Sequence, residues 1–118
     1  MSNTPIAGNN LESVERVLII ASVKKTDDLN WIRELVNKYR SAWLVTDQKS
    51  AELLARENIF SRLEPDRIIV FSGRRPEELS LKIYKISTPD IVYICDKYNV
   101  LKPLVELFRI APVKRVEC

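Results

Sequence analysis

One turn of the sequence combines paired cations, a glycine and the start of a predicted helix. An apolar run is followed by Ser72, Gly73, Arg74 and Arg75, and Pro76 then begins the helix. A guanidinium group can hold a phosphate through two parallel hydrogen bonds, and a helix N-terminus adds unsatisfied N–H groups and partial positive charge. Glycine also lets the backbone approach a ligand closely. The turn therefore predicts a site for an anion, either a phosphate or a nucleotide.

Polar and charged residues also follow other predicted strands, so the predicted ligand site extends beyond this turn. Its members are Ser22, Lys24, Lys25, Ser72, Gly73, Arg74, Arg75 and Asp96. The alternative interpretation is that these are ordinary solvated loop charges, with Arg74 and Arg75 paired to Glu77 and Glu78. Ion pairs of that kind imitate binding sites in many proteins.

The elements that position these residues follow a regular alternation. Apolar runs predict strands at residues 16–23, 42–45, 68–71, 91–95 and 113–116. Apolar residues at helical spacing predict helices over residues 29–39, 50–58, 76–86 and 103–111. Strict β-α alternation predicts an α/β fold: a three-layer αβα sandwich around a five-stranded, mostly parallel sheet.

The order of the strands decides which loops meet. The first, third and fourth strands are the most apolar and are expected to be central, with the second and fifth at the edges. This favours the flavodoxin-like order 2-1-3-4-5, with the Rossmann-like order 3-2-1-4-5 as the alternative. The favoured order would place the loop of Ser22 and Lys24 beside the loop of Arg74.

The usual motifs of catalysis and cofactor binding are missing. The chain has no histidine and two glycines, Gly8 and Gly73, so a dinucleotide fingerprint and a phosphate-binding P-loop are both excluded. Asp27, Asp28, Asp47 and Asp96 lie near the ends of predicted strands, where carboxylates could bind a divalent metal, but they cluster weakly, and helix capping is the better explanation of Asp27 and Asp28. No CxxC pair is present. We therefore predict no catalytic residue, no metal and no cofactor, and the sequence does not favour an enzyme.

Of the two cysteines, Cys95 ends the fourth predicted strand and Cys118 follows the fifth. If those strands are neighbours, both thiols lie at the same end of the sheet, where a disulfide is geometrically conceivable. Intracellular disulfides are rare in mesophiles but known in hyperthermophiles, and the abundance of Lys, Arg, Glu, Ile and Val is typical of thermophilic proteins.

The whole chain of 118 residues suits a disordered tail over residues 1–12 and one α/β domain over residues 13–118. No apolar stretch is long enough to cross a membrane, and a cytoplasmic location is expected. The function predicted is a sensor or regulatory module for a phosphate-containing ligand. One alternative is a homodimeric interaction module without a ligand, suggested by open sheet edges and an off-stripe Trp31. Another is weak nucleic-acid binding, which a net charge of +3 permits without favouring.

Overall fold

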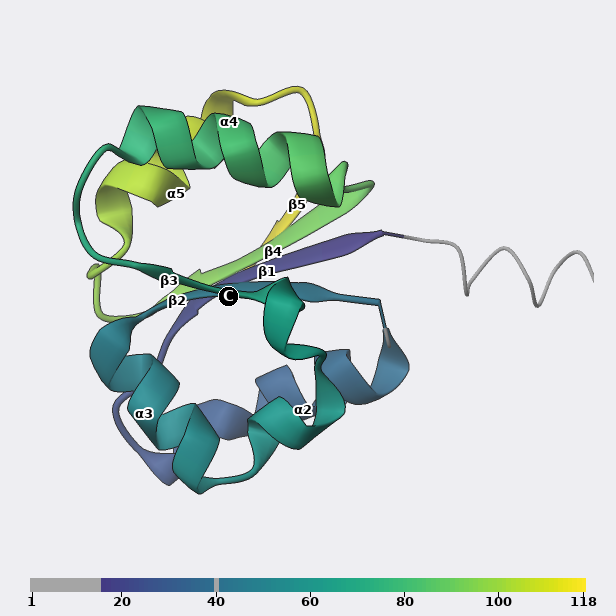
Figure 1. Cartoon of the computed structure of the whole chain (residues 1–118), viewed down its shortest axis with the longest axis vertical. Helices are drawn as coiled ribbons and strands as arrows, with labels where there is room; N and C mark the ends of the chain where they lie inside the picture. The colour runs from purple at the N-terminus through teal and green to yellow at the C-terminus, as the bar shows by residue number, and fades with distance from the viewer. Residues whose placement is uncertain (1–15, 40) are drawn as a thin grey trace, which may run out of the picture.

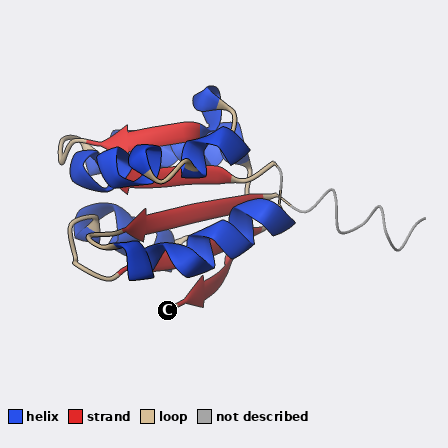
Figure 2. Cartoon of the chain, turned by 90° about the horizontal axis from the view of Figure 1, so that it is seen from below, coloured by secondary structure: helices blue, strands red, loops and turns tan. Residues whose placement is uncertain are grey.

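The computed structural model describes residues 16–39 and 41–118, so the predicted tail over residues 1–12 lies outside the described residues. Within that part of the chain the sheet has five strands, and every pairing is parallel. The strands are β1 (Val17–Ser22), β2 (Trp43–Asp47), β3 (Ile68–Phe71), β4 (Ile91–Asp96) and β5 (Lys114–Glu117). Figure 2 shows their arrows pointing the same way. The α/β class predicted from the alternation is confirmed.

Helices connect the strands and cover both faces of the sheet. They are α2 (Asn30–Lys38), α3 (Gln48–Arg56), α4 (Pro76–Ser87) and α5 (Lys102–Ile110), with short 3-10 turns η1 (Thr26–Leu29), η2 (Ile59–Arg62) and η3 (Pro65–Arg67). Helices α2 and α3 lie on one face, and α4 and α5 lie on the other (Figure 1). No helix among the described residues is both long and apolar enough to cross a membrane.

The core has two halves, one on each face of the sheet, and β1 contributes to both. Val17, Ile19 and Ala21 pack into the half under α2 and α3. Leu18 and Ile20 pack into the half under α4 and α5. All six residues of β1 are buried, which is why this strand reads as a continuous apolar run.

The strand order is β3-β2-β1-β4-β5, so the favoured order 2-1-3-4-5 is wrong and the Rossmann-like alternative is confirmed. The apolar run of β3 suggested a central strand, yet β3 lies at an edge with Val70 41% exposed. Strand β2, which was expected at an edge, is internal, and its polar Thr46 is fully buried. The Thr46 hydroxyl donates to the carbonyl of Ala21 at 2.7 Å, a partner that the local sequence could not reveal.

Candidate functional site

The observed strand order moves the expected binding crevice. In open α/β sheets ligands bind beyond the carboxyl ends of the strands, where the strand order reverses. Here that point lies between β1 and β4, whereas the favoured order placed it between β1 and β3. Ser22 ends β1 and is in register with Asp96, which ends β4, and its hydroxyl donates to the Asp96 carboxylate at 2.8 Å. The turn Ser72–Arg75, named here the arginine turn, is separated from them by β2.

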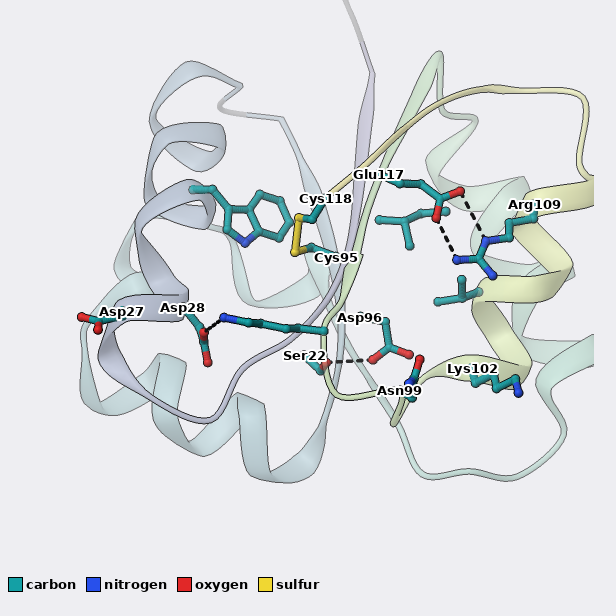
Figure 3. Close-up of a pocket in the computed structure, with 14 residues that line it drawn as sticks. Ser22, Asp27, Asp28, Cys95, Asp96, Asn99, Lys102, Arg109, Glu117 and Cys118 are labelled. Atoms are coloured by element: carbon teal, nitrogen blue, oxygen red, sulfur yellow. Dashed lines mark hydrogen bonds and ion pairs between the residues drawn. A yellow bond between two sulfur atoms is a disulfide. The ribbon is translucent and has the colours of Figure 1, made fainter.

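A cavity of about 520 Å³ lies at this reversal point, and Figure 3 shows the side chains around it. Acids and bases both line it. The charged residues among its walls are Asp27, Asp28, Asp96, Lys97, Lys102, Arg109 and Glu117. Most of these charges pair with one another, including Arg109 with Glu117 at 2.8 Å and Lys97 with Asp28 at 2.8 Å.

Asp28 is the most constrained of these charges, with its side chain only 2% exposed. Its carboxylate accepts hydrogen bonds from the backbone N–H groups of Lys24 and Lys25, at 3.0 and 3.2 Å. It also accepts from Lys97 Nζ at 2.8 Å and from the Tyr98 hydroxyl at 2.6 Å. Burial by itself would raise the pKa of Asp28, but these hydrogen bonds outweigh it and hold the pKa well below its ordinary range. Asp28 is therefore a charged, fully partnered carboxylate.

Aspartate carboxylates also accept hydrogen bonds from backbone N–H groups at the carboxyl ends of β2 and β4. The Asp47 carboxylate accepts from the backbone N–H of Ser50 and so caps α3. The Asp96 carboxylate accepts from the N–H groups of Val100 and Leu101, which lead into α5, at 3.1 and 2.9 Å. At each of these turns a carboxylate of the chain itself already bonds the N–H groups that an anionic ligand would need.

A disulfide between Cys95 and Cys118 forms part of the cavity wall, with a Cα–Cα distance of 5.1 Å. This disulfide joins the end of β4 to the residue after β5, which is the pairing that the sequence made geometrically conceivable. The N–H of Cys118 also donates to the carbonyl of Ile94 at 3.0 Å. Trp31 lines the same cavity and packs, half-buried, against the core under α2 and α3. The subunit contact expected at Trp31 stays a prediction.

The arginine turn has a different character. Gly73 and Arg75 both adopt positive φ angles, +91° and +51°, and no side chain caps the N-terminus of α4. Among the described residues Arg74 has no hydrogen-bond or ion-pair partner, whereas Arg75 lies 3.4 Å from Glu78. That pair is 80% and 71% exposed, so it adds little stability and leaves the guanidinium accessible.

A cavity of about 420 Å³ adjoins this turn. It is lined by Val70, Phe71, Ser72, Arg74, Arg75, Glu78, Leu79 and Lys82. Three of these residues are cations, and Lys82, one helical turn beyond Glu78, had not been included in the predicted site. The i, i+4 spacing of Glu78 and Lys82 on α4 was the available signal.

The predicted site thus divides into two parts. Ser22 and Asp96 lie at the reversal point, joined there by the backbone of Lys24 and Lys25. Ser72, Gly73, Arg74 and Arg75 lie together at the β3 edge of the sheet. Sequence reasoning preferred a helix-capping role for Asp28 over a metal-binding one and did not identify Lys97 and Tyr98 as its partners. Both partners come from a turn 69 or 70 residues away.

The sequence matches no known family model and no curated protein. It is similar in structure to the C-terminal domain of a hydrogenase from Pyrococcus furiosus, with a TM-score of 0.53 and 12% sequence identity. The superposition covers 91% of this chain and 93% of that chain. At this identity the similarity supports the fold alone.

Proposed function

We propose that the domain binds a phosphate-containing small ligand at the arginine turn and acts as a sensor or regulatory module. One observation carries the proposal. Among the described turns that join a strand to a helix, the arginine turn is the one whose N–H groups are not bonded by a carboxylate of the chain. An external anion is the natural partner for such a turn.

The side chains around the turn favour the same ligand. Arg74 is unpartnered within the described chain, and its fork of donors matches the oxygens of a phosphate. Lys82 adds a further cation to Arg74 and Arg75 on the wall of the cavity. Helix α4 has 12 residues, and its N-terminus contributes partial positive charge at the point where the ligand would bind.

The acids at the start of α4 limit the ligand to one that competes with them. Glu77 and Glu78 stand in the first turn of α4, and Glu78 contacts Arg75. A phosphate has more charge and more acceptor oxygens than one exposed carboxylate, so it can displace Glu78 from Arg75. A ligand with a single weak charge would gain less binding free energy from displacing Glu78.

The test is thermal unfolding in the presence of inorganic phosphate, pyrophosphate and a panel of nucleotides. A ligand at about 100 times its dissociation constant should stabilise the protein by about 2.7 kcal/mol. The variant Arg74→Ala with Arg75→Ala should lose this stabilisation. The matched control is Lys24→Ala with Lys25→Ala, which also removes two positive charges from a loop after a strand and should keep it.

Other outcomes would contradict the proposal. Absence of any shift across the panel in the unaltered protein would remove it. Loss of the shift in the lysine variant, with retention in the arginine variant, would move the site to the reversal point. Tight oligonucleotide binding with a steep salt dependence, and no response to mononucleotides, would favour the nucleic-acid alternative.

A further inference from the structure

The disulfide between Cys95 and Cys118 faces the cavity at the reversal point. Both residues line this cavity, and Figure 3 shows the bond on its wall. The two cysteines differ in accessibility, because Cys95 is 7% exposed whereas Cys118 is an exposed residue directly after β5. A thiolate from solution can therefore reach the Cys118 sulfur in the folded protein, with the Cys95 sulfur as the leaving group.

Strand β5, which the disulfide connects to β4, contributes little to the core. All four of its residues are exposed, and within the described chain none belongs to either half of the core. Its backbone pairs with β4, and the N–H of Cys118 donates to the carbonyl of Ile94. The ion pair between Arg109 and Glu117 is half exposed and adds little stability. The disulfide is therefore the strongest side-chain connection at the end of β5.

We propose that this disulfide is a reversible thiol–disulfide switch, which opens the cavity at the reversal point when a dithiol reduces it. Glu117 and Cys118 form the part of the cavity wall that lies at the end of β5. Without the disulfide this end is held by backbone bonds and one exposed ion pair, so it separates from β4 while the core stays folded. Separation also leaves Arg109 on the cavity wall without its partner Glu117. The switch acts at the reversal point and does not depend on the anion site at the arginine turn.

The exchange requires a dithiol as the reductant. One thiolate of the dithiol attacks the Cys118 sulfur, a mixed disulfide forms, and the bond to Cys95 breaks. The second thiolate of the dithiol then attacks the mixed disulfide, closes the reductant's own disulfide and releases Cys118. Two electrons pass from the dithiol to the protein, and the two protons of the dithiol end on Cys95 and Cys118. A disulfide oxidant reverses the exchange.

The first experiment asks whether the folded protein undergoes this exchange. The oxidised protein is incubated with dithiothreitol at rising urea concentrations below the unfolding transition, and the free thiols are alkylated and counted by mass spectrometry. The rate of reduction should change less than about 2-fold over this range, because the reaction does not require unfolding. After removal of the reductant, oxidised glutathione should restore the disulfide. A rate that rises steeply with urea, or a failure to reoxidise, would overturn the proposal.

The second experiment measures the opening of the cavity. Trp31 lines the cavity and is half-buried, so its fluorescence reports the loss of the wall once Trp43→Phe has removed the other tryptophan. Reduction should raise the lifetime-corrected acrylamide quenching constant of Trp31 at least about 2-fold, and Cys118→Ser should do so without reductant. Glu117→Gln is the matched control, because it removes the ion pair at the same edge but keeps the disulfide. Its quenching constant should stay within about 1.2-fold of the original value.

Hydrogen exchange locates the change along the chain. Backbone N–H groups of residues 113–118 should exchange at least about 10-fold faster in the reduced protein and in Cys118→Ser, whereas those of β1 should stay protected. Melting curves verify that both forms still unfold cooperatively. Unchanged exchange over residues 113–118 would overturn the opening of the cavity. Loss of the cooperative transition in both forms would give the disulfide a structural role and overturn the switch.

Discussion

The reversal point between β1 and β4 and the arginine turn after β3 occupy equivalent places in the fold but differ in how their polar groups are satisfied. Both lie where strands end and helices begin, and both carry cations. At the reversal point Asp28 and Asp96 bond the backbone N–H groups, and Lys97 pairs with Asp28. At the arginine turn no carboxylate among the described residues bonds the N–H groups of the turn, and Arg74 has no partner in the described chain. Unsatisfied donors, and not cations alone, therefore distinguish a candidate anion site.

The comparison also separates stability from binding. Polar groups that are buried and fully partnered cost much when one of them is removed, because the others are left unsatisfied. Exposed and unpartnered groups cost little when removed, and their side chains remain available to a ligand. Mutations at the reversal point should therefore lower the free energy of unfolding, whereas mutations at the arginine turn should affect ligand binding and change that free energy little.

The largest expected effect is at Asp28. Asp28→Ala should lower the free energy of unfolding by about 3 kcal/mol, because it leaves two N–H groups, Lys97 and Tyr98 without their shared acceptor. Denaturant unfolding measures this loss. Arg74→Ala with Arg75→Ala should stay within about 0.5 kcal/mol of the original protein. Equal losses in the two variants would contradict the proposed contrast between the regions.

Acid should weaken the reversal point in a smaller and graded way. Hydrogen bonds hold the folded pKa of Asp28 below its unfolded value, so its contribution to stability is complete above about pH 4. The contribution is lost as the pH falls through the lowered folded value. The pKa of Asp90 is lowered by the backbone N–H of Arg16, and that of Glu117 by Arg109, so both act in the same direction.

Urea unfolding between pH 7 and pH 2 measures this dependence. In Asp28→Asn the slope below pH 4 should be shallower, because one of the carboxylates that take up protons on unfolding is gone. A slope identical to that of the original protein would show that Asp28 does not carry the charge assigned to it.

A further substitution gives the arginine turn a carboxylate like those of the other strand ends. Ser72→Asp places a carboxylate after β3, in the way that Asp96 ends β4, close to the free N–H groups of α4. Stability should rise by less than about 1 kcal/mol, through the cap and the helix dipole. The stabilisation by phosphate ligands should disappear, as thermal unfolding would show, and Ser72→Ala should retain it. Retained ligand stabilisation in Ser72→Asp would mean that the turn does not bind the anion.

Local sequence was sufficient for the elements of the fold. The apolar run of β1 predicted a buried central strand, and the turn after β3, with Gly73 and Pro76, predicted the start of α4. These features depend on side-chain period and on residues with restricted backbone angles, which are properties of neighbouring positions. The proximity of Cys95 and Cys118 could also be predicted, because Cys95 lies at the end of β4 and Cys118 directly follows β5, and the two strands run in the same direction.

Strand order and the division of the site were decided only by the tertiary structure. An apolar run such as that of β3 predicts burial, but it does not predict whether the strand has a neighbour on each side. The polar Thr46 suggested that β2 lies at an edge, whereas the structure buries Thr46 and its hydroxyl donates to the carbonyl of Ala21. The partners of Asp28 come from a distant turn that the β1–β4 pairing brings close. Pairing of strands far apart in sequence depends on the packing of the whole chain. The sequence by itself therefore predicted that the arginine turn is rich in cations. Only the tertiary structure showed that this turn is separated from the crevice between β1 and β4.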